Sequence, residues 1–222
     1  MGKPVLCLSG GLDSVTCLAI QGASKCLFFD YGQIAAAKEH EAAQFYARFF
    51  HVPLQVLELP WLATLAQNSG LLRGSVPKFE EPSALDRPST TRESARAVWV
   101  PARNLVFLSA AAAVAEAEEF DSVALGLNRE EGATFPDNSR EFLEAANETL
   151  AHGTLRKVRV VAPVIGFDKN EMVQLLRQRD VPLDACWRTI AARRRRTPGR
   201  HWKWNDFSAP HAPRPWTTSS LR

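Results

Sequence analysis

The chain has 222 residues, of which 45% are hydrophobic and 23% charged, a size that buries about 70% of the unfolded surface in one core. Its apolar runs fall short of the roughly 20 residues that cross a bilayer, so we expect a soluble, cytoplasmic protein without membrane contact. Residues 188–222 hold nine of the 27 Lys and Arg and one of the 24 acids, which leaves 18 basic and 23 acidic residues before them. This acidic body argues against direct nucleic-acid binding, which needs clustered Lys and Arg.

Short apolar runs alternate with helical patterns along the chain. Strands are predicted at residues 4–8, 26–29, 54–59, 123–127 and 158–164. Helices are predicted at residues 12–20, 35–50, 104–118, 140–151 and 168–178. Strands that alternate with helices imply right-handed crossovers and a parallel sheet covered on both faces. We therefore predict an α/β fold with a Rossmann-like, five-stranded parallel sheet between two layers of helices.

Residues 66–96 have a different composition, rich in Ser, Thr, Pro and charge, with Pro77, Pro82 and Pro88 interrupting any regular element. A loop of this length inside a compact domain is typically a lid or a disordered segment. Two interpretations stay open: a lid that closes over a substrate, and a solvated excursion without a role.

The segment SGGLDS at residues 9–14 follows the first predicted strand and opens the first predicted helix. Ligands of open parallel sheets bind beyond the carboxyl ends of the strands, and the first turn is the usual phosphate site. Gly10 and Gly11 allow the backbone to approach an anion closely, and the helix N-terminus complements its charge. Ser9 and Ser14 add hydroxyl donors, whereas Asp13 suits a metal-binding or loop-ordering role.

This loop differs from the P-loop of ATPases, which has Lys before Ser or Thr, and from GxGxxG. Its SGGxDS spelling resembles the signature of pyrophosphatase-loop (PP-loop) enzymes of the HUP type. That resemblance implies cleavage of ATP between its α and β phosphates and transfer of AMP to an acceptor oxygen. The expected nucleotide-binding residues are Leu8, Ser9, Gly10, Gly11, Leu12, Asp13, Ser14 and, after the second strand, Asp30.

Further motifs resemble one branch of that class, the 7-cyano-7-deazaguanine synthase (QueC) family. They are PVLCLSGGLDSVTCLA at 4–19, FDYGQ at 29–33, VPARN at 100–104, GLN at 126–128, TFPDNS at 134–139 and APVIGFDKNEMV at 162–173. The resemblance covers residues 1–187 and implies a ligase of queuosine biosynthesis. Such an enzyme uses ATP, Mg²⁺ and ammonia to convert the purine-like acid 7-carboxy-7-deazaguanine to a nitrile, and the family suggests a homodimer.

Roles follow for several side chains outside the loop. Arg103 and Asn104, at the start of a helix, are candidates to meet a carboxylate or phosphate, since Arg forms bidentate pairs. Lys169 is a candidate to reach a phosphate. The predicted catalytic residues are Asp13, Ser14, Arg103 and Lys169, and the predicted substrate-binding residues are Tyr31, Gln33, Arg103, Asn104 and Asp137. A surface salt bridge for Arg103, a solvated Lys169 and a simple turn at Asp137 are the alternatives.

The four cysteines are scattered, and we interpret Cys7, Cys17 and Cys26 as reduced and structural. The resembling family ends in a zinc knuckle of four cysteines, of which only Cys186 remains here. One thiolate cannot close a tetrahedral Zn²⁺ site. We therefore divide the chain into a catalytic domain at residues 1–187 and a basic tail at 188–222, expected to be disordered.

Two origins of the tail stay open. A reading-frame shift near the Trp187 codon explains the abrupt loss of resemblance, and translation of the gene in the other frames tests it. The alternative is a real basic, aromatic tail that binds RNA through phosphate contacts and base stacking.

Two other functions also stay open. A PP-loop tRNA-modifying enzyme of the thiolase or lysidine synthetase type would use the tail as an RNA anchor, although a catalytic cysteine pair is not evident. An inactive nucleotide-binding relic is the third interpretation.

Overall fold

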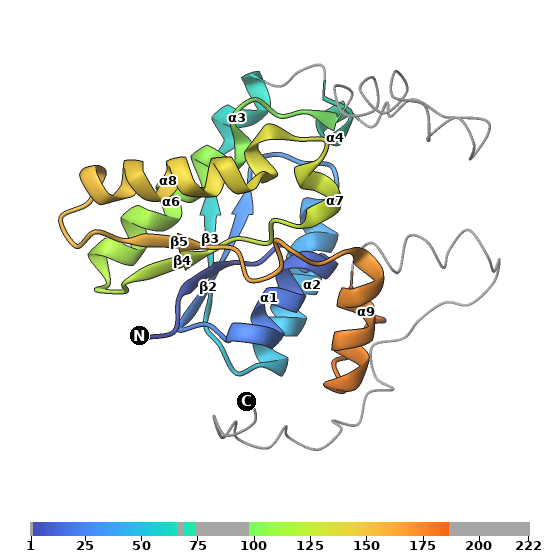
Figure 1. Ribbon diagram of the computed structural model, residues 1–222. Helices are drawn as coiled ribbons and strands as arrows, with labels where there is room; N and C mark the ends of the chain where they lie inside the picture. The colour runs from blue at the N-terminus through green and yellow to red at the C-terminus, as the bar shows by residue number, and fades with distance from the viewer. Residues whose placement is uncertain (1, 66–68, 74–97, 187–222) are drawn as a thin grey trace.

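The computed structural model describes residues 2–65, 69–73 and 98–186. Its centre is a five-stranded sheet with the order β3-β2-β1-β4-β5, in which every pair is parallel (Figure 1). The strands are β1 (Val5–Cys7), β2 (Lys25–Asp30), β3 (Leu54–Glu58), β4 (Ser122–Ala124) and β5 (Arg159–Val161). The order reverses between β1 and β4, which leaves a crevice beyond their carboxyl ends. The predicted fold class is confirmed.

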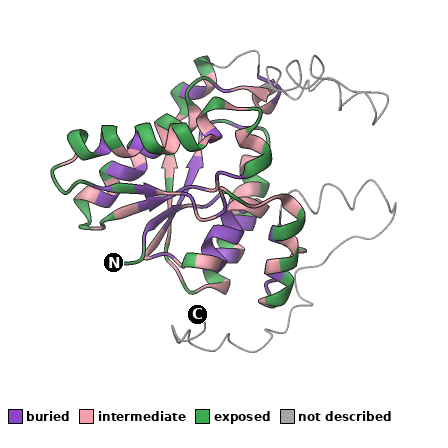
Figure 2. Cartoon of the chain, viewed as in Figure 1, coloured by how far each residue is buried: buried purple, intermediate pink, exposed green. Residues whose placement is uncertain are grey.

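Helices cover both faces of the sheet, as Figure 1 shows. They are α1 (Leu12–Gln21), α2 (Ala36–Phe49), α3 (Pro60–Leu65), α4 (Gly70–Arg73), α6 (Arg103–Ala117), α7 (Arg129–Gly132), α8 (Arg140–Gly153) and α9 (Lys169–Gln178), with a 3₁₀ turn η2 (Pro136–Asn138). One buried cluster joins the sheet to α6 and α8, and a second joins it to α1, α2 and α9. The buried residues therefore concentrate along the strands and the inward faces of the helices (Figure 2).

Local chemistry explains where several elements begin and end. Asp168 and Glu171 form a reciprocal capping box at the start of α9, as the sequence predicts. On the outer edge of the sheet, the side chain of Asn147 accepts from the Val160 N–H at 3.1 Å and donates to the Val160 carbonyl at 2.9 Å. Asn147 therefore makes the hydrogen bonds to Val160 that a neighbouring strand would otherwise make at this edge of β5.

The structure corrects several predicted boundaries. β4 and β5 are shorter than predicted, because the chain beyond Ala124 and Val161 leaves the sheet to build the crevice. Pro60 follows the end of β3 and opens α3, where the missing N–H costs no intrahelical hydrogen bond.

Part of the predicted insertion is helical, since α4 lies within it. The rest of that insertion and the tail at 188–222 lie outside the described residues. Among the described residues, no helix is long and apolar enough to cross a membrane.

Candidate active site

The SGGLDS loop connects β1 to α1 at the crevice, and its two serines hold it together. Ser14 Oγ donates to the Gly11 carbonyl at 3.0 Å and accepts from the Ser9 N–H at 3.3 Å, and the two hydroxyl oxygens lie 3.3 Å apart. Among the described residues, no side chain caps α1 at Gly11. The first turn of α1 lines a cavity, where the helix dipole favours an anion.

The two glycines of the loop have different roles. Gly10 has φ +73°, and a Cβ there would lie 2.5 Å from Ala42 Cβ and 2.7 Å from the Ala43 nitrogen. It therefore allows the loop to pack against α2. Gly11 lines the cavity, and its added Cβ would meet only Ser9 Oγ, at 3.3 Å.

A cavity of about 510 Å³ lies above the loop. It brings together eleven predicted site residues: Leu8, Ser9, Gly11, Leu12, Asp13, Ser14, Tyr31, Gln33, Arg103, Asn104 and Lys169. Four predicted residues, Gly10, Asp30, Asp137 and Cys186, do not line it. Residues more than 150 positions apart thus share one concave surface, as expected of a ligand site.

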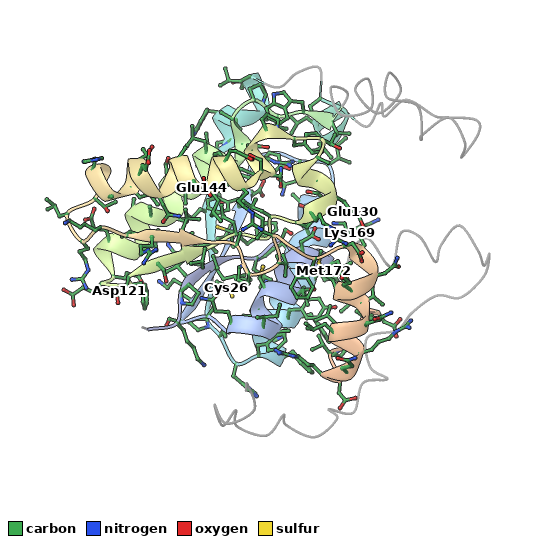
Figure 3. The ribbon with its side chains drawn as sticks, viewed as in Figure 1. Cys26, Asp121, Glu130, Glu144, Lys169 and Met172 are labelled. Atoms are coloured by element: carbon green, nitrogen blue, oxygen red, sulfur yellow. The ribbon has the colours of Figure 1, made fainter. Side chains whose placement is uncertain are left out.

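Lys169, the first residue of α9, reaches across the crevice to the loop. Its Nζ lies 2.6 and 2.8 Å from the two carboxylate oxygens of Asp13 and 3.2 Å from Glu131 Oε1. Lys169 also lies beside Glu130, whose side chain accepts from its backbone N–H at 3.0 Å (Figure 3). Both Asp13 oxygens are paired with a cation, so Asp13 orders the loop without repelling a phosphate.

The turn after β2 is organised by two of its own side chains. Gln33 is buried, accepts from the Tyr31 N–H at 3.0 Å and donates to the Phe29 carbonyl at 3.1 Å. Asp30 accepts from the Gly32 N–H at 3.0 Å. Gln33 and Asp30 therefore shape the turn that places Tyr31 in the cavity, where its hydroxyl accepts from Arg103 Nη1 at 3.4 Å.

Arg103 and Asn104 open α6, and Asp137 from the η2 turn packs against them. Asp137 Oδ2 accepts from the Asn104 N–H at 3.4 Å, and Oδ1 accepts from Asn138 Nδ2 at 3.0 Å. Burial raises the pKa of Asp137 above its ordinary value, and the Asn104 N–H and the Arg103 charge oppose that shift. Asp137 is more than a simple turn residue, because it also fixes the start of α6.

A second cavity, of about 190 Å³, adjoins the first. Trp99 and Phe135 line it with rings stacked 6.0 Å apart at 11°, and Asp137 lies in its wall. Arg103 and Glu131 line both cavities. The site thus has a large compartment over the loop, a smaller aromatic one, and one cationic and one anionic side chain where they meet.

Among the described residues, Cys7, Cys17 and Cys26 are free thiols. Burial raises the pKa of Cys26 to about 12 and raises those of Cys7 and Cys17 as well, so these thiols stay protonated. Cys7 lines the larger cavity, and Cys186 is buried in the core beside α9. Within the described residues, no three His, Cys, Asp or Glu side chains are grouped to hold a metal ion.

Several residues that line the cavities were not predicted as site residues, among them Gly126, Glu131, Trp99 and Phe135. Gly126, after β4, lines the larger cavity, and a Cβ there would lie 3.0 Å from the Ser14 nitrogen. Glu131 lines both cavities. One signal for it was present, since Asn128 precedes it by three residues and caps α7 by accepting from its N–H.

The family model described as queuosine biosynthesis protein QueC matches residues 3–197. The chain is 44% identical over 189 residues to 7-cyano-7-deazaguanine synthase of Pelotomaculum thermopropionicum, covering 83% of this chain and 86% of that one. It is 38% identical over 184 residues to the synthase of Pyrococcus horikoshii, covering 80% and 77%.

A solved structure, the U34-tRNA thiolase NcsA from Methanococcus maripaludis with its [4Fe-4S] cluster, is 13% identical and has a TM-score of 0.48. The alignment covers 89% of this chain and 67% of that one.

Proposed function

The chain belongs to the family of queuosine biosynthesis proteins QueC, and from this premise we propose that it converts 7-carboxy-7-deazaguanine and ammonia to 7-cyano-7-deazaguanine with ATP. One observation carries the proposal at the level of the site. The SGGLDS loop lines a cavity that adjoins a second, aromatic cavity, and Arg103 lines both. Two compartments suit two substrates, a nucleotide and a planar acid.

ATP occupies the larger cavity in this proposal. Its phosphates accept hydrogen bonds from N–H groups at the start of α1 and from the Ser9 hydroxyl, while Ser14 holds the loop in shape through the Gly11 carbonyl. Lys169 neutralises Asp13, so the loop does not present an uncompensated carboxylate to the triphosphate. Gly11 leaves the backbone accessible at this point.

The purine-like acid occupies the smaller cavity. Trp99 and Phe135 offer apolar ring surface, and Asp137 offers a carboxylate that accepts from the amino and ring N–H groups of a guanine-like edge. Arg103 suits the substrate carboxylate, because a guanidinium forms bidentate pairs with carboxylates. The carboxylate then faces the nucleotide compartment.

The chemistry needs activation because a carboxylate resists nucleophiles and lacks a good leaving group. Its oxygen attacks the α phosphorus of ATP, pyrophosphate leaves, and ammonia displaces AMP from the acyl adenylate to give an amide. A second adenylation, on the amide oxygen, provides the leaving group for nitrile formation. Orientation of the two reactants in adjoining cavities supplies much of the rate enhancement.

The family resemblance involves two metals, Mg²⁺ with ATP and a structural Zn²⁺ whose cysteine ligands, apart from Cys186, are missing from this sequence. Mg²⁺ accompanies ATP because it binds phosphate oxygens with few protein carboxylates, so its protein ligands need not form a cluster. A structural Zn²⁺ site does not fit the described residues, since Cys186 is a single buried thiol.

Residues 1–187 form the catalytic domain in this proposal. The tail at 188–222 is proposed to come from a reading-frame shift, and a CxxCxxC motif in another frame of the gene would support this. Its absence from every frame would favour a real tail.

Pyrophosphate release from ATP tests the function. Release should depend on 7-carboxy-7-deazaguanine, with the nitrile formed when ammonia is present. Release that needs tRNA would indicate a tRNA-modifying enzyme, and no release with either would indicate a relic. Light scattering of the same preparation tests the predicted homodimer.

A further inference from the structure

The two cavities meet at two side chains of opposite charge. Arg103 and Glu131 are the residues that line both compartments within the described part of the chain. The proposed function already uses Arg103 for the substrate carboxylate. Glu131 has no part in binding ATP or the acid, although it lies where the acyl group and the nucleotide must meet.

Glu131 is held in place from two sides. Its backbone N–H donates to Asn128 Oδ1 at 3.0 Å, and Asn128 is fully buried. Its Oε1 lies 3.2 Å from Lys169 Nζ, while 30% of its side-chain surface is accessible to solvent and it lines both cavities. A fixed carboxylate with an open side is suited to accept a proton from a bound molecule.

We propose that Glu131 accepts the proton that ammonia loses when it attacks the acyl adenylate; this rests on the proposed function. The nitrogen lone pair forms the C–N bond, and the C–O bond to AMP breaks, so that the electron pair leaves on the phosphate oxygen. One N–H proton passes to the Glu131 carboxylate and from there to water. The products are the amide, AMP and the regenerated carboxylate.

Two nearby carboxylates, Asp13 and Asp137, have other partners and roles. Asp13 uses both oxygens for Lys169 at 2.6 and 2.8 Å, shorter than the 3.2 Å contact of Glu131. Asp137 accepts from Asn104 and Asn138 through its two oxygens. Glu131 alone among these three borders both compartments.

Glu131→Gln tests the proposal because it keeps the shape and the oxygen near Lys169 but lowers the basicity. Glu130→Gln is the matched control, since the neighbouring Glu130 is exposed and lies outside both cavities. Exchange of labelled pyrophosphate into ATP, with the acid and without ammonia, reports adenylation. Amide formation with ammonia reports the nitrogen step, and hydroxamate formation with hydroxylamine reports the same step with a second nitrogen nucleophile.

For Glu131→Gln we expect exchange within about threefold of the unmodified enzyme and a loss of amide formation of about 100-fold, the scale of general-base catalysis. Hydroxamate formation should fall along with amide formation, because hydroxylamine also loses an N–H proton when it attacks the acyl adenylate. Glu131→Asp should lie between Gln and Glu, and Glu130→Gln should match the unmodified enzyme.

Two results would overturn the inference: unchanged amide formation in Glu131→Gln, or an equal loss of exchange and amide formation, which would place Glu131 in adenylation. Absence of exchange in the unmodified enzyme would instead overturn the proposed function, and this role of Glu131 with it. The arms of the experiment thus separate the two failures.

Discussion

Substitution of the two adjacent glycines of the loop by Ala should affect different properties: Gly10→Ala should lower the stability of the fold, and Gly11→Ala should weaken ATP binding. In Gly10→Ala, the φ of +73° places an L side chain in the left-handed region, which costs about 1–2 kcal/mol. The new Cβ would also lie 2.5 Å from Ala42 Cβ and 2.7 Å from the Ala43 nitrogen, and such overpacking costs about 1–3 kcal/mol. The free energy of unfolding should therefore fall by about 2–5 kcal/mol.

For a domain of this size, each kcal/mol lowers Tm by about 2–4 °C, so Gly10→Ala should melt about 4–20 °C lower. Gly11→Ala is the matched variant, because Gly11 has φ −79° and its Cβ would meet only a flexible hydroxyl. It should change Tm by less than about 3 °C, but weaken ATP binding because the methyl group enters the cavity.

Thermal unfolding by circular dichroism and calorimetric titration with ATP measure the two effects. A Tm of Gly10→Ala equal to that of the unmodified protein would refute the packing role of Gly10. So would a loss of stability in Gly11→Ala as large as that in Gly10→Ala. Equal ATP affinity in Gly11→Ala and the unmodified protein would show that the larger cavity is not the nucleotide site.

Three further predictions follow from the contacts of the site and the sheet edge. Lys169→Met removes the ammonium group from the Asp13 carboxylate, so repulsion between this carboxylate and the phosphates should raise the Kd for ATP at least about tenfold, which is about 1.4 kcal/mol. An unchanged Kd in titration calorimetry would contradict this. Asn147→Ala removes both hydrogen bonds to Val160. It should lower the free energy of unfolding, measured in urea, by about 1–3 kcal/mol. A decrease below about 0.5 kcal/mol would contradict this and indicate that water replaces the amide. Burial raises the folded-state pKa of Asp137 above its unfolded value. As pH rises from about 4, Asp137 therefore loses its proton in the unfolded state before it does so in the folded state, and the protein loses stability until the pH has passed the folded-state pKa. Urea unfolding at pH 4 and pH 7 should therefore show Asp137→Asn gaining relative stability at pH 7, and a pH-independent difference would refute this.

Much of the fold could be predicted from the sequence because its signals are local. The alternation of short apolar runs with helical patterns indicates parallel crossovers, and all five strands and the sheet type are confirmed. Asp168 followed by Glu171 marked the start of α9 correctly, since both capping bonds form within four residues. The ends of β4 and β5 were predicted too far along, because apolar side chains continue into the crevice after sheet pairing stops.

What the tertiary structure decided lies between segments that are distant in the chain. The PP-loop motif identifies the nucleotide loop, but the roles of its two glycines depend on α2, which packs against Gly10 and leaves Gly11 open. Lys169 meets Asp13 only because α9 returns beside α1. Glu131 carries no motif of its own, and its place where two cavities join results from the packing of α6, α7 and α9. Periodicity and capping are short-range properties of a sequence, whereas a cavity is defined by the side chains that tertiary packing places around it.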